Sequence, residues 1–251
     1  MKIAVLAGWI ARALVIILSL VNSRLLFELV GIDGLAVQSI LISLATWFAL
    51  LNLGIPFAVQ NLIARYRAEG KDYDRLKQTA SSVLLVMSIL FLPLVIGIGV
   101  AVKYFVLSSY SFVATSTVVI FCVGLFVAGL SVLFNQMLYA EQKGYWPNLY
   151  PALNALCVTV CLIAFRSLII HNINLVLLVF VIANLLVAGL GGFQAKVPCK
   201  LCLDRKILTE IWYNSRGFAL FAFLAASVLS IDYLVMSRIL SPQEIAVYNI
   251  C

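Results

Sequence analysis

The stretch "LLNLGIPFAVQNLIARY", Leu50 to Tyr66, interrupts a long apolar run with polar and helix-breaking residues. Pro56 has no backbone N–H, so a helix through this point loses the hydrogen bond that the carbonyl of Asn52 would accept. We therefore predict a kink between Asn52 and Pro56, eased by Gly54. A helix that serves only as an apolar anchor needs none of these residues, and the stretch indicates a further role.

The chain around this stretch is too apolar for a soluble domain. Of its 251 residues, 64% are hydrophobic and 11% are charged, and the mean hydropathy is +1.12. Soluble domains have about 25% charged and about 45–50% apolar residues. The apolar residues form continuous blocks without the alternation of β-barrel strands. These features predict an all-α polytopic membrane protein.

Segments of about 20 largely apolar residues are long enough to cross the hydrocarbon core as helices. The first such segment contains Arg12 and has no convincing cleavage site, so we expect it to be retained as a span. The tail "LSPQEIAVYNIC", Leu240 to Cys251, indicates a short loop followed by the first turn of an eighth span. The seven predicted spans are Ile3–Val21, Leu35–Ile63, Ser81–Val102, Phe112–Leu138, Leu149–Phe165, Leu175–Phe193 and Phe218–Met236.

The lysines and arginines are distributed unevenly between the two sets of connections. Twelve of the 17 fall in the connections on the side of the N-terminus, at Lys2, in 65–77, at Lys143 and in 196–216. Cytoplasmic loops carry the excess of positive charge, so the N-terminus is predicted to be cytoplasmic. The net charge of +7 then indicates contact with anionic lipid headgroups rather than with nucleic acid.

Polar residues inside the predicted spans indicate a solute pathway. Asn52, Pro56 and Gln60 are four residues apart and would share one face of a continuous helix. This face is expected to line a cavity, or alternatively to bond a neighbouring helix without a transport role. Arg12 is expected to face an interior path, or alternatively to extend to the interface. Further polar residues in the spans are Asn61, Asn135, Gln136, Asn154, Asn184 and the carboxylate Asp232.

Motifs for catalysis or metal binding are weak. Asp72 and Asp74 have the spacing of a metal-binding pair, but they lie in a short basic loop and are interpreted as a solvated turn. Cys199 and Cys202 form only half of a zinc site. The single histidine, His171, makes no catalytic constellation. We therefore predict no catalytic residue, no metal and no cofactor, and we do not expect an enzyme.

Four stretches, "LVGIDGLAVQS", "WFALLNLGIPFAVQNLIAR", "LYAEQKGYWPNL" and "DYLVMSRILSPQEIAVYNI", carry a family likeness. They resemble Wzx-type O-antigen and capsule oligosaccharide flippases, the polysaccharide transporter branch of the MATE-like superfamily. The resemblance implies two helical lobes around a cationic cavity. It also implies that undecaprenyl-pyrophosphate-linked oligosaccharide repeat units cross the bacterial cytoplasmic (inner) membrane by alternating access, for O-antigen or capsule assembly.

The expected substrate pathway combines this resemblance with the polar residues in the spans. Its basic members would suit a lipid pyrophosphate. Expected partners are the lipid-linked oligosaccharide, membrane lipids and other polysaccharide-assembly membrane proteins, and not nucleic acid. The pathway residues are Arg12, Arg24, Asn52, Pro56, Gln60, Asn61, Arg65, Asn135, Gln136, Asn154 and Asp232.

The resemblance divides the chain into 1–195, a six-helix MATE-like lobe, 196–216, a cytoplasmic basic loop, and 217–251, the truncated start of a second lobe. One alternative is a cation-coupled multidrug or small-solute exporter of the same superfamily, which would need an intramembrane carboxylate such as Asp232. The other is a membrane glycosyltransferase or polymerase, which usually carries a larger loop than any in this chain.

Overall fold

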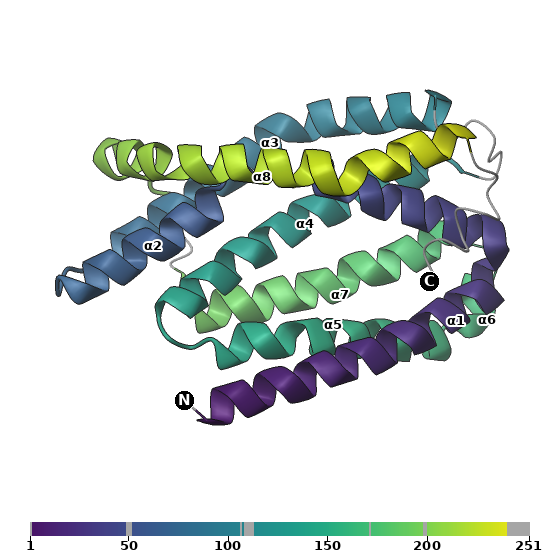
Figure 1. Ribbon diagram of the computed structural model, residues 1–251, viewed down its shortest axis with the longest axis horizontal. Helices are drawn as coiled ribbons and strands as arrows, with labels where there is room; N and C mark the ends of the chain where they lie inside the picture. The colour runs from purple at the N-terminus through teal and green to yellow at the C-terminus, as the bar shows by residue number, and fades with distance from the viewer. Residues whose placement is uncertain are drawn as a thin grey trace.

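The computed structural model describes residues 2–48, 52–105, 107, 113–170, 172–197 and 200–239, with side chains for all of these except 2–7, 43–44, 46–48 and 226–239. Every regular element in that part of the chain is a helix, which confirms the predicted all-α class. The helices lie side by side in an elongated bundle (Figure 1). They are α1 (Lys2–Phe48), α2 (Ile55–Ala68), α3 (Asp74–Phe105), α4 (Thr115–Ala140), α5 (Tyr145–Ala164), α6 (Arg166–Ile169), α7 (Ile173–Gln194) and α8 (Arg205–Ile239).

Helix α1 consists of two limbs that meet at Gly31. This residue has φ 72° and ψ −174°, a conformation that glycine adopts without the steric cost of a side chain. The first limb runs along the bundle, and the second turns back from its far end (Figure 1). The segment between the first two predicted spans is therefore helical on both sides of Gly31.

The backbone breaks before α2, where the quoted stretch predicts a kink. Leu53 and Gly54 have φ 48° and 69°, and α2 begins at Ile55 with Pro56 in its first turn. Proline is tolerated there because its missing N–H would have no helical partner. The predicted kink is confirmed. The prediction of one continuous second span, Leu35–Ile63, is wrong. Asn52 lies before the break, so it does not share a helix face with Pro56 and Gln60.

Five helical segments of the described chain are long and apolar enough to cross a membrane: Gly8–Ile42, Asp74–Phe105, Thr115–Ala140, Tyr145–Ala164 and Ile173–Gln194. The seventh predicted span falls within α8, which begins at Arg205, inside the segment expected to be a loop. The predicted start of an eighth span lies outside the described residues.

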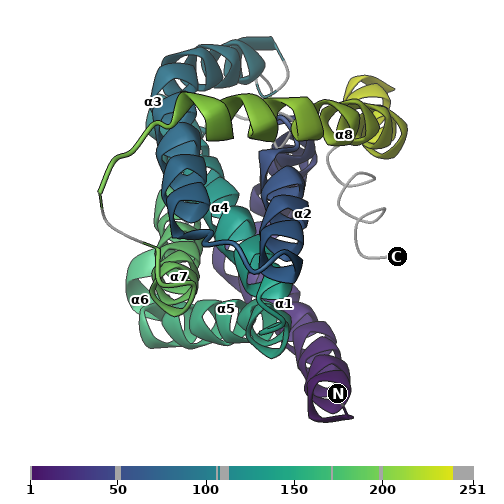
Figure 2. The same ribbon diagram turned by 90° about the vertical axis from the view of Figure 1, so that its left-hand side faces the viewer.

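The centre of the bundle is α4, which packs against α7, α3 and α2, while α1 packs against α5 and α8. Helices α8 and α5 lie on opposite sides of the bundle (Figure 2). Apolar side chains such as Leu133, Met137 and Leu162 are fully buried between the helices. Others, such as Leu90 and Phe193, are 70% and 82% exposed, which suits contact with lipid.

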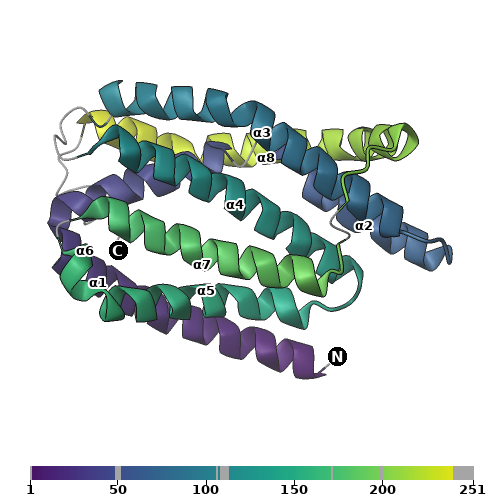
Figure 3. The same ribbon diagram turned by 180° about the vertical axis from the view of Figure 1, so that it is seen from behind.

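One end of the bundle, here called the basic end, collects most of the positive charge. Helices α1, α3, α5 and α8 begin there, and α2, α4 and α7 end there (Figure 3). The opposite end carries Lys103 and Arg166. The basic end carries Arg65, Arg67, Lys71, Arg75, Lys77, Lys143, Lys196, Lys200, Arg205 and Lys206.

Candidate functional site: a polar cavity within the bundle

A cavity of about 490 Å³ lies between α1, α4, α5 and α7, and we call it the polar cavity. Its walls are apolar where Leu26, Val132, Val158 and Phe180 line it. The described residues that line it include no charged side chain. Its polar lining consists of Ser19, Asn22, Ser23, Gln38, Ser131, Asn135, Tyr150, Asn154 and Asn184.

Two asparagines join α5 to α7 in the wall of the polar cavity. The side-chain amide of Asn154 donates to the Oδ1 atom of Asn184 at 3.1 Å, and the Nδ2 atom of Asn184 donates to the carbonyl of Phe180 at 2.9 Å. Polar side chains inside an apolar bundle are expensive unless they find partners. The pair therefore satisfies part of its own hydrogen-bonding capacity and fixes the position of both amides beside the cavity.

A second polar contact joins α1 to α5. Asn22 is 8% exposed, its amide donates to the carbonyl of Ala155 at 3.3 Å, and its Oδ1 atom accepts from the hydroxyl of Thr159 at 2.8 Å. Each partner comes from the facing helix, so the bonds set the distance between the helices as well as satisfying the amide. Hydrogen bonds of asparagine side chains thus join three of the four helices around the cavity, α1, α5 and α7.

Two fully buried side-chain polar atoms of the lining residues have no hydrogen-bond partner among the described residues. They are Oε1 of Gln38, on the second limb of α1, and the hydroxyl of Tyr150, on α5. Tyr150 is 3% exposed, so its hydroxyl is shielded from solvent. A buried polar group without a partner costs about 1–3 kcal/mol. Both atoms are covered by neighbouring side chains, so a ligand in the cavity would bond them only after those side chains move.

The polar cavity contains two of the sequence-predicted pathway residues, Asn135 and Asn154. Asn184, which the sequence also marks as polar within a span, is the partner of Asn154. Gln38 and Tyr150 were not predicted. Gln38 lies close to the expected outer end of a span, and tyrosine is also typical of a membrane interface, so neither residue stands out in the sequence.

The other predicted amides lie away from the polar cavity. Asn52 lines a smaller cavity of about 50 Å³ between α3 and α4, together with Ser88 and Cys122. On α2, Pro56 is buried, Gln60 is half-buried and Asn61 is exposed. Gln136 on α4 is half-buried and does not line the polar cavity.

The predicted arginines are on the outside of the described bundle. Arg12 is exposed on the first limb of α1. Arg24 is exposed and bonds Glu28, one turn along the same helix, at 3.3 Å. Arg65 forms an ion pair with Glu210 of α8. The structure therefore does not bring these three side chains to the polar cavity, and the side chain of Asp232 lies outside those described.

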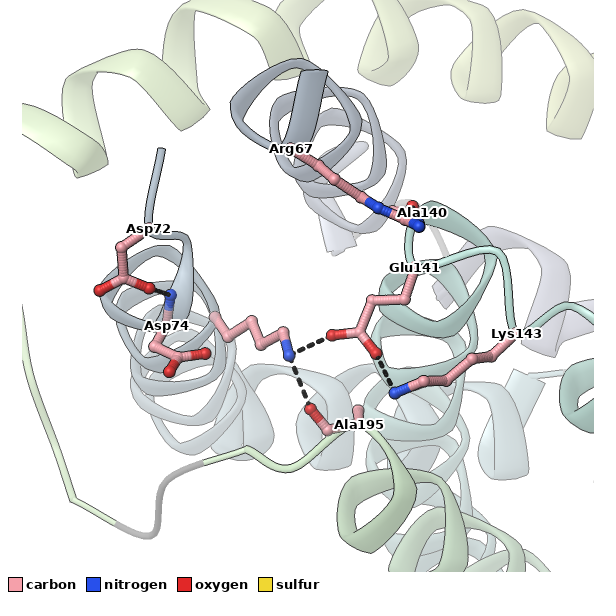
Figure 4. A network of polar contacts seen from close by, with 8 residues as sticks. Arg67, Asp72, Asp74, Ala140, Glu141, Lys143 and Ala195 are labelled. Atoms are coloured by element: carbon pink, nitrogen blue, oxygen red, sulfur yellow. Dashed lines mark hydrogen bonds and ion pairs between the residues drawn. The ribbon is translucent and has the colours of Figure 1, made fainter. Parts of the chain in front are cut away.

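A buried ion network at the basic end was not predicted. Lys77 of α3 and Glu141, which follows α4, form an ion pair, and Lys143 bonds the same carboxylate at 2.6 Å (Figure 4). The ammonium group of Lys77 also donates to the carbonyl of Ala195, beyond α7, at 2.9 Å. Burial raises the pKa of Glu141, but hydrogen bonds from Lys143 and Lys77 outweigh it and leave the pKa below its usual value.

Helix α2 is held closely against α8. The hydroxyl of Tyr66 donates to Glu210 at 2.6 Å, and mainly for this reason the pKa of Tyr66 rises to about 12. The rings of Phe57 and Phe218 stack with their centroids 5.8 Å apart. These contacts join the helix that follows the backbone break to the first part of α8.

Three curated bacterial proteins are similar to the chain over 97% of its length. One is the "Putative O-antigen export protein" of Yersinia pseudotuberculosis, at 28% identity, and two are each named "Putative O-antigen transporter", from Salmonella typhimurium at 26% and Salmonella typhi at 25%. They confirm the resemblance to O-antigen transport proteins. The chain spans 58% of the length of these relatives. No family model matches the chain, and no solved structure matches it.

Proposed function

We propose that the chain forms part of a transporter that moves undecaprenyl-pyrophosphate-linked oligosaccharide repeat units across the bacterial inner membrane by alternating access. The similarity to proteins named for O-antigen export and transport supports a role in transport. The observation that carries the proposal is the polar cavity inside a bundle of apolar helices. An anchor has no need to keep amides such as Asn135 and Asn154 at this depth, where polar groups are expensive.

The chemistry of the cavity suits the sugars of such a substrate. Sugars present hydroxyl groups that both donate and accept, and amide and hydroxyl side chains complement both functions. The described lining is uncharged, so it can exchange hydrogen bonds with neutral sugars without holding them by an ion pair. In this proposal the lipid tail remains in the bilayer while the sugars pass through the cavity. The cation-coupled exporter would need an intramembrane carboxylate such as Asp232, whose side chain lies outside those described.

We infer that the basic end faces the cytoplasm, because positive charge gathers on the cytoplasmic side of membrane proteins. We also propose seven spans, with the second one broken before α2, and the start of an eighth. The basic loop 196–216 would separate the first lobe, 1–195, from the start of the second, 217–251. The pyrophosphate would contact the predicted arginines. Arg12 is the best placed of these, because it is exposed within a span and has no ion-pair partner among the described residues. Arg65 would first have to leave Glu210.

The remaining predicted residues keep proposed roles along the route into and out of the cavity. Gln60 and Asn61 lie on α2, close to the basic end, where the headgroup would enter. Asn52 and Pro56 lie at the backbone break, which would bend as access alternates. Arg24, Gln136 and Asp232 are proposed as further pathway positions.

The test is restoration of surface polysaccharide in cells that lack their own O-antigen flippase. Asn154→Leu combined with Asn184→Leu should reduce the polysaccharide while the membrane level of the protein stays unchanged. Asn214→Leu on α8 is the matched control, because this asparagine bonds a carbonyl of its own helix and lies outside the cavity. Equal polysaccharide from the cavity variant and the control would contradict a role of the cavity in transport.

A further inference from the structure

An apolar groove lies at the basic end between α2, α3 and α8, separate from the polar cavity. Its volume is about 380 Å³, and every described residue that lines it is apolar. Leu203 and Trp212, on the α8 side, are 59% and 53% exposed, so the groove opens to the surface of the bundle. Ile55, Val83 and Met87 form the opposite wall. The groove can therefore accept an apolar chain from the surroundings of the protein.

The rim of this groove carries positive charge. The segment before α8 is fixed along α3, because Gln78 donates to the carbonyl of Lys200 at 2.7 Å and the N–H of Cys202 donates to Ser82 at 3.0 Å. Leu203 follows in the groove, and Arg205 and Lys206 begin α8. Lys200, Arg205 and Lys206 are exposed and have no ion-pair partner among the described residues.

The acidic residue among these cations is engaged elsewhere. The carboxylate of Asp204 accepts from the backbone N–H groups of Lys206 at 2.9 Å and Ile207 at 3.4 Å. It thus satisfies donors in the first turn of α8, where a negative charge is favourable. The side chains of Lys200, Arg205 and Lys206 remain available to an anion from outside the protein.

The groove lies at the depth of lipid headgroups. The first turns of α8 run across the bundle at its basic end, and the rest of the helix runs along it (Figure 2). An apolar-faced helix that lies across the end of a bundle in this way follows the membrane surface rather than crossing the hydrocarbon core. Trp212 and Tyr213 lie in these turns, and aromatic residues of this kind are typical of the membrane interface. An apolar groove below a cationic rim at this depth has the shape and polarity of a lipid site.

We propose that this groove binds an anionic phospholipid of the surrounding bilayer. One acyl chain lies in the groove against Trp212, and the phosphate of the headgroup contacts Lys200, Arg205 and Lys206. A zwitterionic lipid offers the same acyl chain but no net negative charge, so the cationic rim selects the anionic lipid. The proposal does not depend on which substrate passes through the polar cavity.

Quenching of Trp212 by brominated lipids tests the proposal. The protein is placed in phosphatidylcholine bilayers that contain either brominated phosphatidylglycerol or brominated phosphatidylcholine at equal mole fraction. The Trp212 signal is the difference in fluorescence between the protein and Trp212→Phe. We expect the anionic lipid to quench it more strongly. Arg205→Gln and Lys206→Gln should each lower this preference by about two- to five-fold, the effect of removing one basic residue near an anionic lipid.

Arg166→Gln is the control, because it removes an exposed arginine at the opposite end of the bundle. It should leave the preference unchanged. Equal quenching by the two lipids, or an unchanged preference in both Arg205→Gln and Lys206→Gln, would overturn the proposal. Displacement of the brominated lipid by undecaprenyl phosphate, but not by excess unbrominated phosphatidylglycerol, would also overturn it and assign the groove to the polyprenyl carrier.

Discussion

Lys77 and Glu141 form an ion pair in which 4% and 5% of the two side chains are exposed. The pair joins the first turn of α3 to the residue that follows α4, and the carbonyl of Ala195 adds the end of α7. Lys143, 39% exposed, provides the second cation for the carboxylate. The basic end is thus held by paired charges at the point where three helices leave the apolar bundle.

Removing one partner of this pair should destabilise the protein strongly. Glu141→Gln leaves the ammonium group of Lys77 buried without a counter-charge, and Lys77→Met leaves Glu141 with Lys143 alone. Breaking a buried pair costs about 3–5 kcal/mol, because the remaining charge stays desolvated. The free energy of unfolding in detergent measures the effect. Lys143→Gln, at the more exposed cation, should cost clearly less, and equal losses in all three variants would contradict a buried pair as the cause.

The same carboxylate predicts loss of stability in acid. The pKa of Glu141 in the folded protein is lower than its ordinary value of 4.5, so the folded state favours the ionised form. Its stabilising contribution is therefore present above pH 4.5 and is lost as the pH falls through the lowered folded-state pKa. Thermal unfolding between pH 7 and pH 3 should show this loss. In Glu141→Gln the decline should be smaller, and an identical decline in both proteins would rule out Glu141 as its source.

The residues differ in how far their sequence context predicts their roles. The break before α2 was predictable, because Pro56 lacks a backbone N–H in any tertiary context. The reversal of the chain between the first two predicted spans was expected. Its form, two helical limbs that meet at Gly31, was not, because a glycine between two apolar runs is equally compatible with a loop. The cavity residues Asn135 and Asn154 were predictable from the cost of amides within a span. The pairing of Lys77 with Glu141 was not predictable, because it depends on how α3 and α4 pack. The count of lysines and arginines that orients the spans gives no information on which of these charges are buried.

Gly54→Ala should weaken the contact between α2 and α8. A Cβ atom at Gly54 would lie 2.6 Å from the Cβ atom of Phe218 and 2.7 Å from the backbone nitrogen of Ala219. Gly54 also has φ 69°, where a side chain costs about 1–2 kcal/mol. The clash adds to this cost because the α8 backbone would have to move. Thermal unfolding, with cross-linking between cysteines placed on α2 and α8, measures both effects.

Gly70→Ala is the matched control for this substitution. Gly70 has φ 67°, and no atom lies within 4 Å of a Cβ built there. It therefore carries the conformational cost without the clash, and its loss of stability should be smaller. Equal losses of stability in Gly54→Ala and Gly70→Ala would mean that the clash with α8 adds nothing to the conformational cost at Gly54.

The hydrogen bond from Tyr66 to Glu210 predicts a loss of stability in alkali. It raises the pKa of Tyr66 from 10.0 to about 12, so the folded state favours the protonated hydroxyl. The stabilising contribution is present below pH 10 and is lost as the pH rises toward 12. The midpoint of thermal unfolding should fall over this range. Tyr66→Phe should reduce that fall, and a fall of unchanged size would show that other groups cause it.

Tyr150→Phe separates a substrate contact from a structural role in the polar cavity. The hydroxyl of Tyr150 is buried without a partner among the described residues, so its removal should leave stability unchanged or slightly higher. If the hydroxyl bonds the transported sugar, export of polysaccharide should fall by about two- to ten-fold, the value of one hydrogen bond. The measurements are thermal unfolding and surface polysaccharide at matched protein level.

Thr79→Val is the control for this prediction. It removes another buried hydroxyl without a partner among the described residues, on α3 and outside the cavity, and should leave export unchanged. A loss of export in Tyr150→Phe that is matched by Thr79→Val would assign the effect to the fold rather than to the substrate.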